Sequence, residues 1–282
     1  MSANTSPLAG GIISLRPYQA EVVSTVREVL RRVRRPMIYL PTGGGKTRVA
    51  TAITQLTLAK SSGRVIVLAN RKQLVHQFAG ALRAAGLDVG IAQGDNTTGL
   101  HNRVIVASID TVHARNYMFD DVALFIIDEA HAVAGSEKYK SLLSRYNRVP
   151  VIGLSATPFA RGLGKPYQEL GDKPLFEELI VGSTVQQLVD DGFLTDIEIY
   201  CPSKPDMTGA KLTRTPEGEQ DYRQADIDEA TDKPELVGDI IQHWLKLAKG
   251  VKTICFASSI AHSKHIVGKR STNPILPGFA RP

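Results

Sequence analysis

Cysteine is scarce in this chain, and long apolar runs are missing. Only two cysteines, Cys201 and Cys255, occur among 282 residues. They are too few for a disulfide framework and too far apart for a zinc cluster, so a reducing compartment fits best and we expect the cytoplasm. No apolar run approaches membrane-spanning length, and residues 1–10 lack a basic region followed by an apolar one. The sequence therefore predicts neither membrane insertion nor secretion.

Basic residues are concentrated near the N-terminus. The net charge is +6, yet the first 100 residues hold 13 Lys and Arg against 4 Asp and Glu. Five of these cations crowd the end of the first expected helix: Arg27, Arg31, Arg32, Arg34 and Arg35. Such a surface could meet nucleic-acid phosphates, but cations also suit the negative end of a helix dipole. Charge alone leaves both interpretations open.

A glycine-rich stretch follows the short apolar run at 37–40. Its glycines let the backbone turn tightly and direct N–H groups at an anion, and the helix that begins near Lys46 adds the positive end of its dipole. Lys46 would reach the outer phosphates of a nucleotide, and the Thr47 hydroxyl would help to coordinate Mg²⁺. Leu40 replaces the usual glycine, so this is a variant phosphate loop, and a flexible turn is the alternative. The predicted nucleotide-binding residues are Pro41, Thr42, Gly43, Gly44, Gly45, Lys46 and Thr47.

Two carboxylates end a second apolar run. Leu-Phe-Ile-Ile at 124–127 is followed by Asp-Glu-Ala-His at 128–131. Such a run predicts a buried parallel strand whose carboxyl end delivers Asp128 and Glu129 to the crevice where open α/β sheets bind ligands. Asp128 would hold Mg²⁺, and Glu129 would orient and polarise the attacking water. A surface acidic pair is the alternative, which the upstream phosphate loop makes less attractive.

Further motifs occur in the order of a known family. Leu-Arg-Pro-Tyr-Gln at 15–19 resembles the adenine-reading motif of superfamily 2 nucleic-acid helicases and translocases, and Leu-Ala-Asn-Arg-Lys-Gln-Leu at 68–74 resembles their motif Ia. Val-Ala-Ser-Ile-Asp-Thr at 106–111 is similar to the next strand-end motif, and Gly-Leu-Ser-Ala-Thr-Pro at 153–158 is similar to motif III. Together with the phosphate loop and Asp-Glu-Ala-His, these segments resemble the DEAH-box-like group of the restriction-enzyme and repair-helicase type.

The resemblance implies a fold and a reaction. The fold would be a RecA-like, parallel, doubly wound α/β sheet of the P-loop NTPase class, followed by a partial second RecA-like lobe. The reaction would be Mg²⁺-dependent hydrolysis of ATP, stimulated by DNA or RNA, with Lys46, Asp128 and Glu129 as catalytic residues. Gln19 and Arg16 would contact the adenine. DNA is favoured over RNA, because the adenine-reading and Ia segments resemble those of DNA translocases.

The same resemblance assigns roles to other polar residues at strand ends. The residues implied in coupling hydrolysis to a following domain are His131, Ser155 and Thr157. The residues implied in holding a nucleic-acid backbone are Asn70, Arg71, Ser108 and Thr111. Backbone contacts of this kind position a strand and carry no base code. Alternatively, Arg71 could be an exposed helix side chain without a role in binding, and Ser108 could be a helix cap.

Four segments are expected along the chain. They are a loose tail at 1–14, an ATP-binding lobe at 15–194, a linker or hairpin region at 195–233 and an incomplete second lobe at 234–282. The first and second expected lobes are separated by polar, Pro- and Gly-containing sequence. Within this C-terminal half, we predict strands at residues 197–200 and 252–256, and a loop at 161–173.

The family pattern ends within the last part of the chain, since residues 269–282 resemble neither motif V nor motif VI. Ala-Ser-Ser at 257–259, with His262, resembles motif IV at the opening of the second lobe. His262 and His265 could share a helix face, but two histidines alone make a poor metal site. The arginines with which a second lobe stabilises the transferred phosphoryl group do not follow. A truncated or frameshifted product is therefore expected, and the sequence gives little support for unwinding by this chain alone.

Two other functional classes remain open. One is a non-catalytic, nucleotide-gated nucleic-acid-binding module, which the missing arginines favour; it would bind ATP without turnover. The other is a different P-loop NTPase, such as a small-molecule kinase or a transport ATPase, whose turnover would be indifferent to nucleic acid. Neither of these enzymes accounts for Asp-Glu-Ala-His and Ser-Ala-Thr together.

Overall fold

The computed structural model describes residues 13–133, 136–158, 175–200, 204–214 and 220–271. The chain divides into two compact units, Met1–Asp196 and Ile197–Pro282. The expected tail at 1–14 falls almost wholly outside the described residues, and so does the expected loop at 161–173. Among the helices of the described ranges, none is long and apolar enough to cross a membrane.

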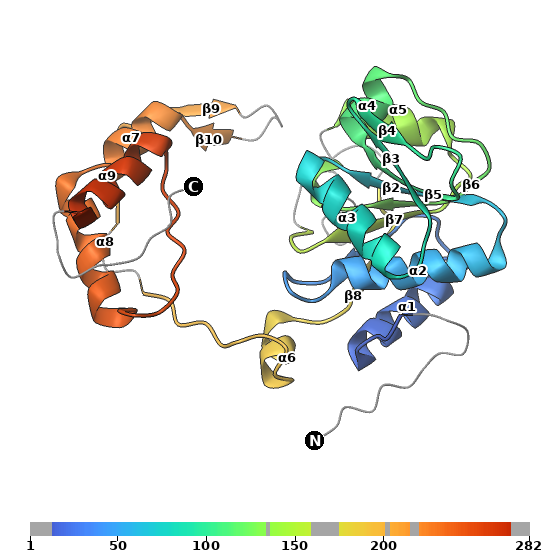
Figure 1. Ribbon diagram of the computed structural model, residues 1–282, viewed down its shortest axis with the longest axis horizontal. Coiled ribbons are helices and arrows are strands. Elements are labelled where there is room, and N and C mark those ends of the chain that lie inside the picture. The colour runs from blue at the N-terminus through green and yellow to red at the C-terminus, as the bar shows by residue number, and fades with distance from the viewer. Residues whose placement is uncertain (1–12, 134–135, 159–174, 201–203, 215–219, 272–282) are drawn as a thin grey trace. The chain divides into compact units, whose positions relative to one another are not determined.

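An eight-stranded sheet forms the centre of the first unit, with the order β4-β3-β5-β2-β6-β7-β1-β8 (Figure 1). All neighbouring strands run parallel except the pair β3 and β4. The strands are β1 Pro36–Tyr39, β2 Arg64–Ala69, β3 Val89–Gln93, β4 Asn96–Thr98, β5 Val104–Ser108, β6 Val122–Ile127, β7 Val151–Ser155 and β8 Glu178–Val181. Because the central strands are buried on both faces, their sequences are continuous apolar runs. The predicted parallel α/β class is confirmed.

Helices cover both faces of this sheet, as a doubly wound fold requires (Figure 1). On one face the core includes Val65, Val67 and Ile126, and on the other it includes Ile66, Leu68 and Ile127, so alternate residues of β2 and β6 face opposite sides. The first core is covered by α1 Pro17–Val29, α2 Lys46–Lys60 and α3 Lys72–Ala84. The second core is covered by α4 Ile109–Ala114 and α5 Glu137–Arg145.

Gly153 in β7 lies in the tightest part of the second core. A Cβ atom there would lie 2.7 Å from the Phe176 ring and 2.9 Å from Ala130 Cβ, and both neighbours are fully buried. We expect Gly153→Ala to lower the free energy of unfolding by about 1–3 kcal/mol, measured by urea denaturation. Gly80→Ala is the control, because a Cβ at this exposed site in α3 meets open space and is expected to stabilise by roughly 0.5–1 kcal/mol. Equal effects of the two substitutions would contradict this packing.

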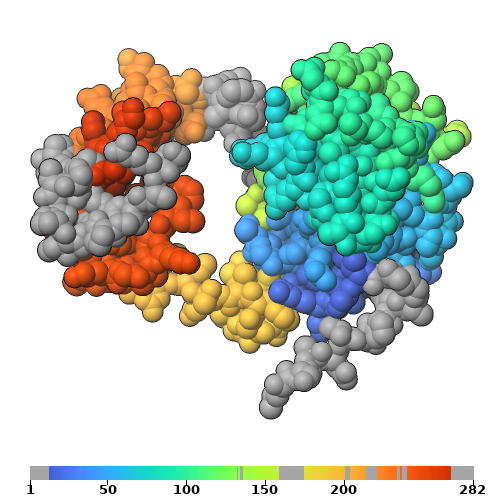
Figure 2. Space-filling view, in the orientation of Figure 1, coloured from blue at the N-terminus to red at the C-terminus, as the bar shows by residue number. Residues whose placement is uncertain are grey.

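The short helix α6, Val185–Asp190, ends the first unit. A capping box closes its start, where Gln187 N donates to Thr184 Oγ1 and Thr184 N donates to Gln187 Oε1. Gly192, with a φ of 72°, closes its end. In the space-filling view this yellow segment lies against blue atoms of the N-terminal part of the same unit (Figure 2).

The second unit is mainly helical in its described residues. Its helices are α7 Gln224–Thr231, α8 Pro234–Leu247 and α9 Ile260–Ser271, and β9 Leu212–Arg214 pairs with β10 Gln220–Tyr222 as an antiparallel hairpin. The strands predicted at 197–200 and 252–256 are wrong, because neither segment pairs with another strand in the described residues. Their apolar side chains stay exposed: Ile199 is 80% exposed, Ile254 81% and Phe256 92%. Apolar sequence alone does not make a strand when no neighbour supplies backbone hydrogen bonds.

Candidate nucleotide-binding site

The phosphate-loop candidate joins β1 to α2. Gly43 and Gly45 have φ angles of 81° and 82°, which favour glycine, and Gly44 N donates to Pro41 O at 2.9 Å. The loop thereby turns directly into the N-terminus of a 15-residue helix, where backbone N–H groups and the helix dipole favour an anion. Leu40, which stands where the general motif has glycine, is completely buried in the first core. The departure from the motif therefore serves core packing.

The two carboxylates follow β6 on the same edge of the sheet. Asp128 N donates to Leu68 O at 3.0 Å, and the residue is 8% exposed. Glu129 has a φ of 50°, an uncommon value for a residue other than glycine, and its Oε1 lies 4.0 Å from Lys46 Nζ. The backbone after β6 thus turns Glu129 toward the phosphate loop.

A cavity of about 280 Å³ lies between the phosphate loop and these acids. Thr47 and Asp128 both line it, and hydroxyl and carboxylate oxygens are ligands that suit Mg²⁺. Among the described residues no cluster of three or more His, Cys, Asp or Glu could hold a metal by itself. This donor set fits an ion that shares its coordination with phosphates and water. The lining residues are Pro41, Thr42, Gly43, Gly45, Lys46, Thr47, Leu74, Gln77, Phe78, Asp128 and Glu129.

Burial raises the pKa of the Asp128 carboxyl, and the neighbouring Glu129 raises it further, while Lys46 partly offsets both. The folded chain therefore holds this proton more tightly than the unfolded chain does. Folding stability consequently falls as the pH rises from the ordinary value of 3.8 through the raised pKa, and the loss is complete above it. This loss of stability is the free-energy cost of burying the charged Asp128 carboxylate before any cation is bound.

Asp128→Asn is expected to raise the melting temperature at neutral pH, in buffer with a chelator and without nucleotide, because it removes this buried charge. The gain should shrink steadily as the pH is lowered through the raised pKa, since Asp128 then becomes neutral in the wild type. Thermal melts of both chains between about pH 7 and 4.5 check this. A gain that is the same across that range would contradict the assignment to Asp128.

A polar relay connects the acids with the end of β7. His131 lies in the 3₁₀ helix Ala130–Val133, and its Nδ1 is 3.4 Å from Glu129 Oε2 and 3.1 Å from Ser155 Oγ. Thr157 N donates to Ser155 Oγ at 3.0 Å, and Thr157 Oγ1 lies 3.4 Å from the same His131 nitrogen. The structure therefore brings together the three residues named from the coupling motifs.

The N-terminal motif lies directly behind the phosphate loop. Gln19 is 1% exposed; its Nε2 donates to Gly44 O at 3.1 Å, and its Oε1 accepts from Arg16 N at 3.0 Å. Tyr18 Oη also donates to Gly44 O, at 2.9 Å. The Gln19 amide is thus hydrogen-bonded inside the protein, to the loop that would bind the phosphates. Its predicted contact with adenine stays a prediction.

Comparison with known proteins adds the family. The family described as type III restriction enzyme, Res subunit, matches residues 12–160, more than half of the chain. The chain belongs to this family of superfamily 2 helicases. The Res-family match contains the phosphate loop, the two acids and the His131–Ser155 contact. The predicted helicase resemblance is confirmed.

Individual relatives of this Res-family chain are much longer. A 51.5 kDa protein of a Lactococcus phage is 31% identical over 228 residues, which cover 81% of this chain and 45% of the relative. ATP-dependent RNA helicase DHX58 of Mus musculus is 29% identical, over 54% of this chain and 26% of its own length. DNA 3'-5' translocase XPB2 of Sulfurisphaera tokodaii is 30% identical, over 54% and 33%. The chain spans less than half of each.

The residues predicted to hold nucleic acid lie at the carboxyl ends of β2 and β5, which pair with Ala69 opposite Ser108. Asn70 follows β2, Arg71 is the exposed N-cap residue of α3, and Asn70 Oδ1 is buried without a hydrogen-bond partner among the described residues. Ser108 takes the N-cap position of α4, but its side chain makes no capping bond there. Thr111 Oγ1 accepts from Gly94 N at 2.7 Å, so this hydroxyl already serves the fold.

Several residues around the site of this Res-family chain were not predicted from sequence. Leu74, Gln77 and Phe78 bring one side of α3 to the cavity, and their i, i+3, i+4 spacing is the signal that could have placed them on one face. Phe193 and Leu194 also lie near the loop. A Cβ on Gly43 would be 2.7 Å from Leu194 Cδ2, and the Arg16 guanidinium lies 4.1 Å from the Phe193 ring centroid. Nothing in the local sequence marks these two contacts.

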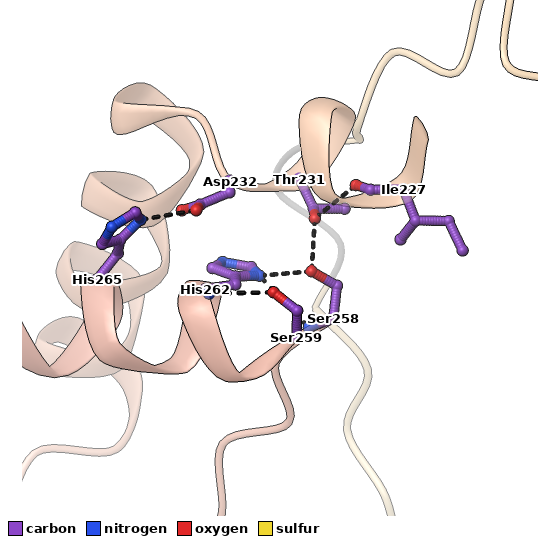
Figure 3. A network of polar contacts seen from close by, with 7 residues as sticks. All are labelled: Ile227, Thr231, Asp232, Ser258, Ser259, His262 and His265. Carbon is purple, nitrogen blue, oxygen red and sulfur yellow. Dashed lines mark hydrogen bonds and ion pairs between the residues drawn. The ribbon is translucent and has the colours of Figure 1, made fainter. Parts of the chain in front are cut away.

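The segment that resembles motif IV contributes to a separate polar network in the second unit (Figure 3). Thr231 Oγ1 donates to Ile227 O at 2.7 Å, and Ser258 Oγ lies 2.9 Å from both Thr231 Oγ1 and His262 Nδ1. His265 Nδ1 instead lies 2.6 Å from Asp232 Oδ2. The two histidines thus face different partners, and the network connects the end of α7 to the start of α9.

Proposed function

We propose that this chain is an ATP-dependent helicase or translocase module that hydrolyses ATP to ADP and phosphate when nucleic acid is bound. The observation that carries the proposal is the cavity between the phosphate loop and the Asp128–Glu129 pair, in a chain of the Res family. A cation, a helix N-terminus and two carboxylates around one space suit the positioning and charge stabilisation that phosphoryl transfer needs.

Each residue at the cavity then has a role in the reaction. Lys46 holds the outer phosphates, Thr47 and Asp128 bind Mg²⁺, and Glu129 orients and deprotonates the attacking water. Lys46 Nζ and Glu129 Oε1 lie 4.0 Å apart, so the lysine ammonium is already beside the base before nucleotide enters. Backbone N–H groups of the loop hold the remaining phosphate oxygens. Residues 41–47 thus form the phosphate site, and Gln19 with Arg16 holds the adenine.

Turnover would be communicated to the rest of the chain through His131. This side chain contacts Glu129, Ser155 and Thr157, so a change at the water-activating carboxylate reaches the end of β7 in one step. We assign residues 15–194 to the ATP-binding lobe, 195–233 to a linker and 234–282 to the start of a second lobe. The division of the chain after Asp196 supports the first of these boundaries, whereas residues 197–282 form one compact unit and the boundary at 233 rests on the sequence alone.

Nucleic acid would bind at the carboxyl ends of β2 and β5, through Asn70, Arg71, Ser108 and Thr111. The N-terminus of α3 and the exposed Arg71 favour a phosphate, and such contacts are independent of base sequence. DNA is the proposed polymer, on the likeness of residues 15–19 and 68–74 to DNA translocases. The relatives' names include both an RNA helicase and a DNA translocase.

Steady-state phosphate release from ATP and Mg²⁺ tests the proposal. The full chain is assayed alone and with single-stranded and double-stranded DNA and RNA. We expect DNA to stimulate release; stimulation by RNA alone would correct the polymer but keep the function. Bound ATP without turnover under every condition would instead make the chain a nucleotide-gated binding module, and turnover indifferent to all four polymers would make it another kind of P-loop NTPase.

A further inference from the structure

The phosphate loop is packed from behind by a segment that none of the motifs includes. Three successive glycines of the loop each face a side chain from elsewhere. A Cβ on Gly43 would lie 2.7 Å from Leu194 Cδ2, one on Gly44 would lie 3.5 Å from Leu188 Cδ1, and one on Gly45 would overlap Gln19 Nε2. Two of these three neighbours belong to residues 188–194, which we name the brace.

Backbone hydrogen bonds within the brace hold its turn in one conformation. Leu188 is completely buried, and both Phe193 N and Leu194 N donate to its carbonyl oxygen, at 2.8 and 2.9 Å. Gly192 N donates to Val189 O at 2.9 Å, which completes the hydrogen-bond pattern of a Schellman motif at the end of α6. Since the capping box fixes the other end, the six-residue helix and the turn behind it form one closed unit.

The brace is also fixed to the strand that carries the loop. β8, which leads into α6, pairs in parallel with β1, with Tyr39 opposite Val181, and Gly182 N donates to Tyr39 O at 3.0 Å. On its other side the Phe193 ring lies under the Arg16 guanidinium and 5.7 Å from the Tyr18 ring, measured between centroids. Tyr18 in turn donates to Gly44 O. The brace, the loop and the N-terminal motif therefore form one closed circuit of contacts.

We propose that the brace holds the phosphate loop in its nucleotide-binding shape, with Leu194 as the positioning residue for Gly43. Glycines at positive φ are free to move in isolation, because glycine populates many backbone conformations. Apolar packing against Leu194 and Leu188 removes that freedom before a nucleotide arrives, so less ordering has to occur on binding. The inference rests on the proposed function for its nucleotide, but the ordering of the loop belongs to the free chain.

Two measurements on the full chain test the role of the brace: amide hydrogen exchange and ADP binding. Leu194→Ala is expected to increase amide exchange at residues 42–47 about 10-fold in the nucleotide-free chain and to raise the Kd for Mg·ADP about 10-fold, by removing half-buried apolar contact. Leu194→Met should leave the exchange and the Kd near their wild-type values, because the methionine side chain fills the same space as leucine. Leu100→Ala, at another half-buried leucine packed on the second core, is the control and should change neither.

The outcomes separate the brace from the proposed function. Unchanged exchange at 42–47 in Leu194→Ala would overturn the brace, even if the wild type binds ADP. If amide exchange at 42–47 rises in Leu194→Ala while the wild type binds no ADP, the brace is kept and the nucleotide function is rejected. Leu194→Val keeps part of the apolar contact and is expected to fall between alanine and wild type; it serves if the alanine variant does not fold. An equal rise in Leu100→Ala would show a general loosening of the fold and would also overturn the proposal.

Discussion

Lys46→Ala is expected to lower stimulated phosphate release at least about 100-fold, because removing a preorganised charge from phosphoryl transfer typically costs this much. Lys46 lines the cavity and opens α2, and its side chain is only 14% exposed. It lies 4.0 Å from Glu129 Oε1, on the acid side of the same space. The measurement is steady-state release with the polymer that stimulates the wild type.

Lys60→Ala provides the matched control for this substitution. Lys60 is the last residue of the same helix and is exposed. Its removal deletes an identical side chain far along α2 from the cavity, so turnover should stay within about twofold of wild type. If both alanine variants retained wild-type turnover while melting like the wild type, the phosphate loop would not be the site of hydrolysis.

Glu129→Gln is expected to reduce turnover about 100- to 10,000-fold while ATP still binds, since an amide cannot accept the proton of the attacking water. The left-handed backbone of Glu129 fixes its side chain toward Lys46 and His131. Glutamine keeps the size of the side chain and removes only its charge and basicity. Single-turnover hydrolysis and equilibrium ATP binding, measured on the same preparation, separate the chemical step from affinity.

Glu137→Gln is the control for the loss of a carboxylate. Glu137 begins α5, its side chain is 83% exposed, and it pairs with Lys140 on the same helix. Exposed pairs of this type contribute little, so we expect wild-type turnover. A Glu129→Gln variant that hydrolysed ATP as fast as Glu137→Gln would assign the general base to another residue.

The central strands could be predicted because their sequence and their environment agree. β1, β2, β5, β6 and β7 are short apolar runs buried on both faces, and runs of this kind predict strands, as the run at 124–127 does. β8, Glu-Leu-Ile-Val, was not distinguished from its surroundings, although it pairs with β1 and leads into α6. Conversely, residues 252–256 have a strand-like composition but no ladder partner among the described residues. Pairing is a tertiary property, and four or five residues do not encode it alone.

The site shows the same contrast between features that the local sequence encodes and contacts that only the tertiary structure makes. The loop at 41–47 and the acids at 128–129 were found because their chemistry needs those residue types at those spacings. The packing of Leu194 on Gly43 joins residues 151 positions apart, and the hydrogen bond from Gly94 N to Thr111 Oγ1 joins the turn after β3 to helix α4, so neither leaves a local pattern. The buried Leu40 shows the converse, since core packing alters a position of the general motif without removing the loop.

Calorimetric titration of the wild-type chain with ADP, with and without Mg²⁺, tests the central claim most directly. The claim is that the cavity between the phosphate loop and Asp128–Glu129 binds a magnesium nucleotide. We predict saturable binding at one site per chain, strengthened by Mg²⁺ in the wild type, with the Mg²⁺ effect lost in Asp128→Asn. The absence of any saturable heat, in a chain whose thermal unfolding is cooperative, would contradict it.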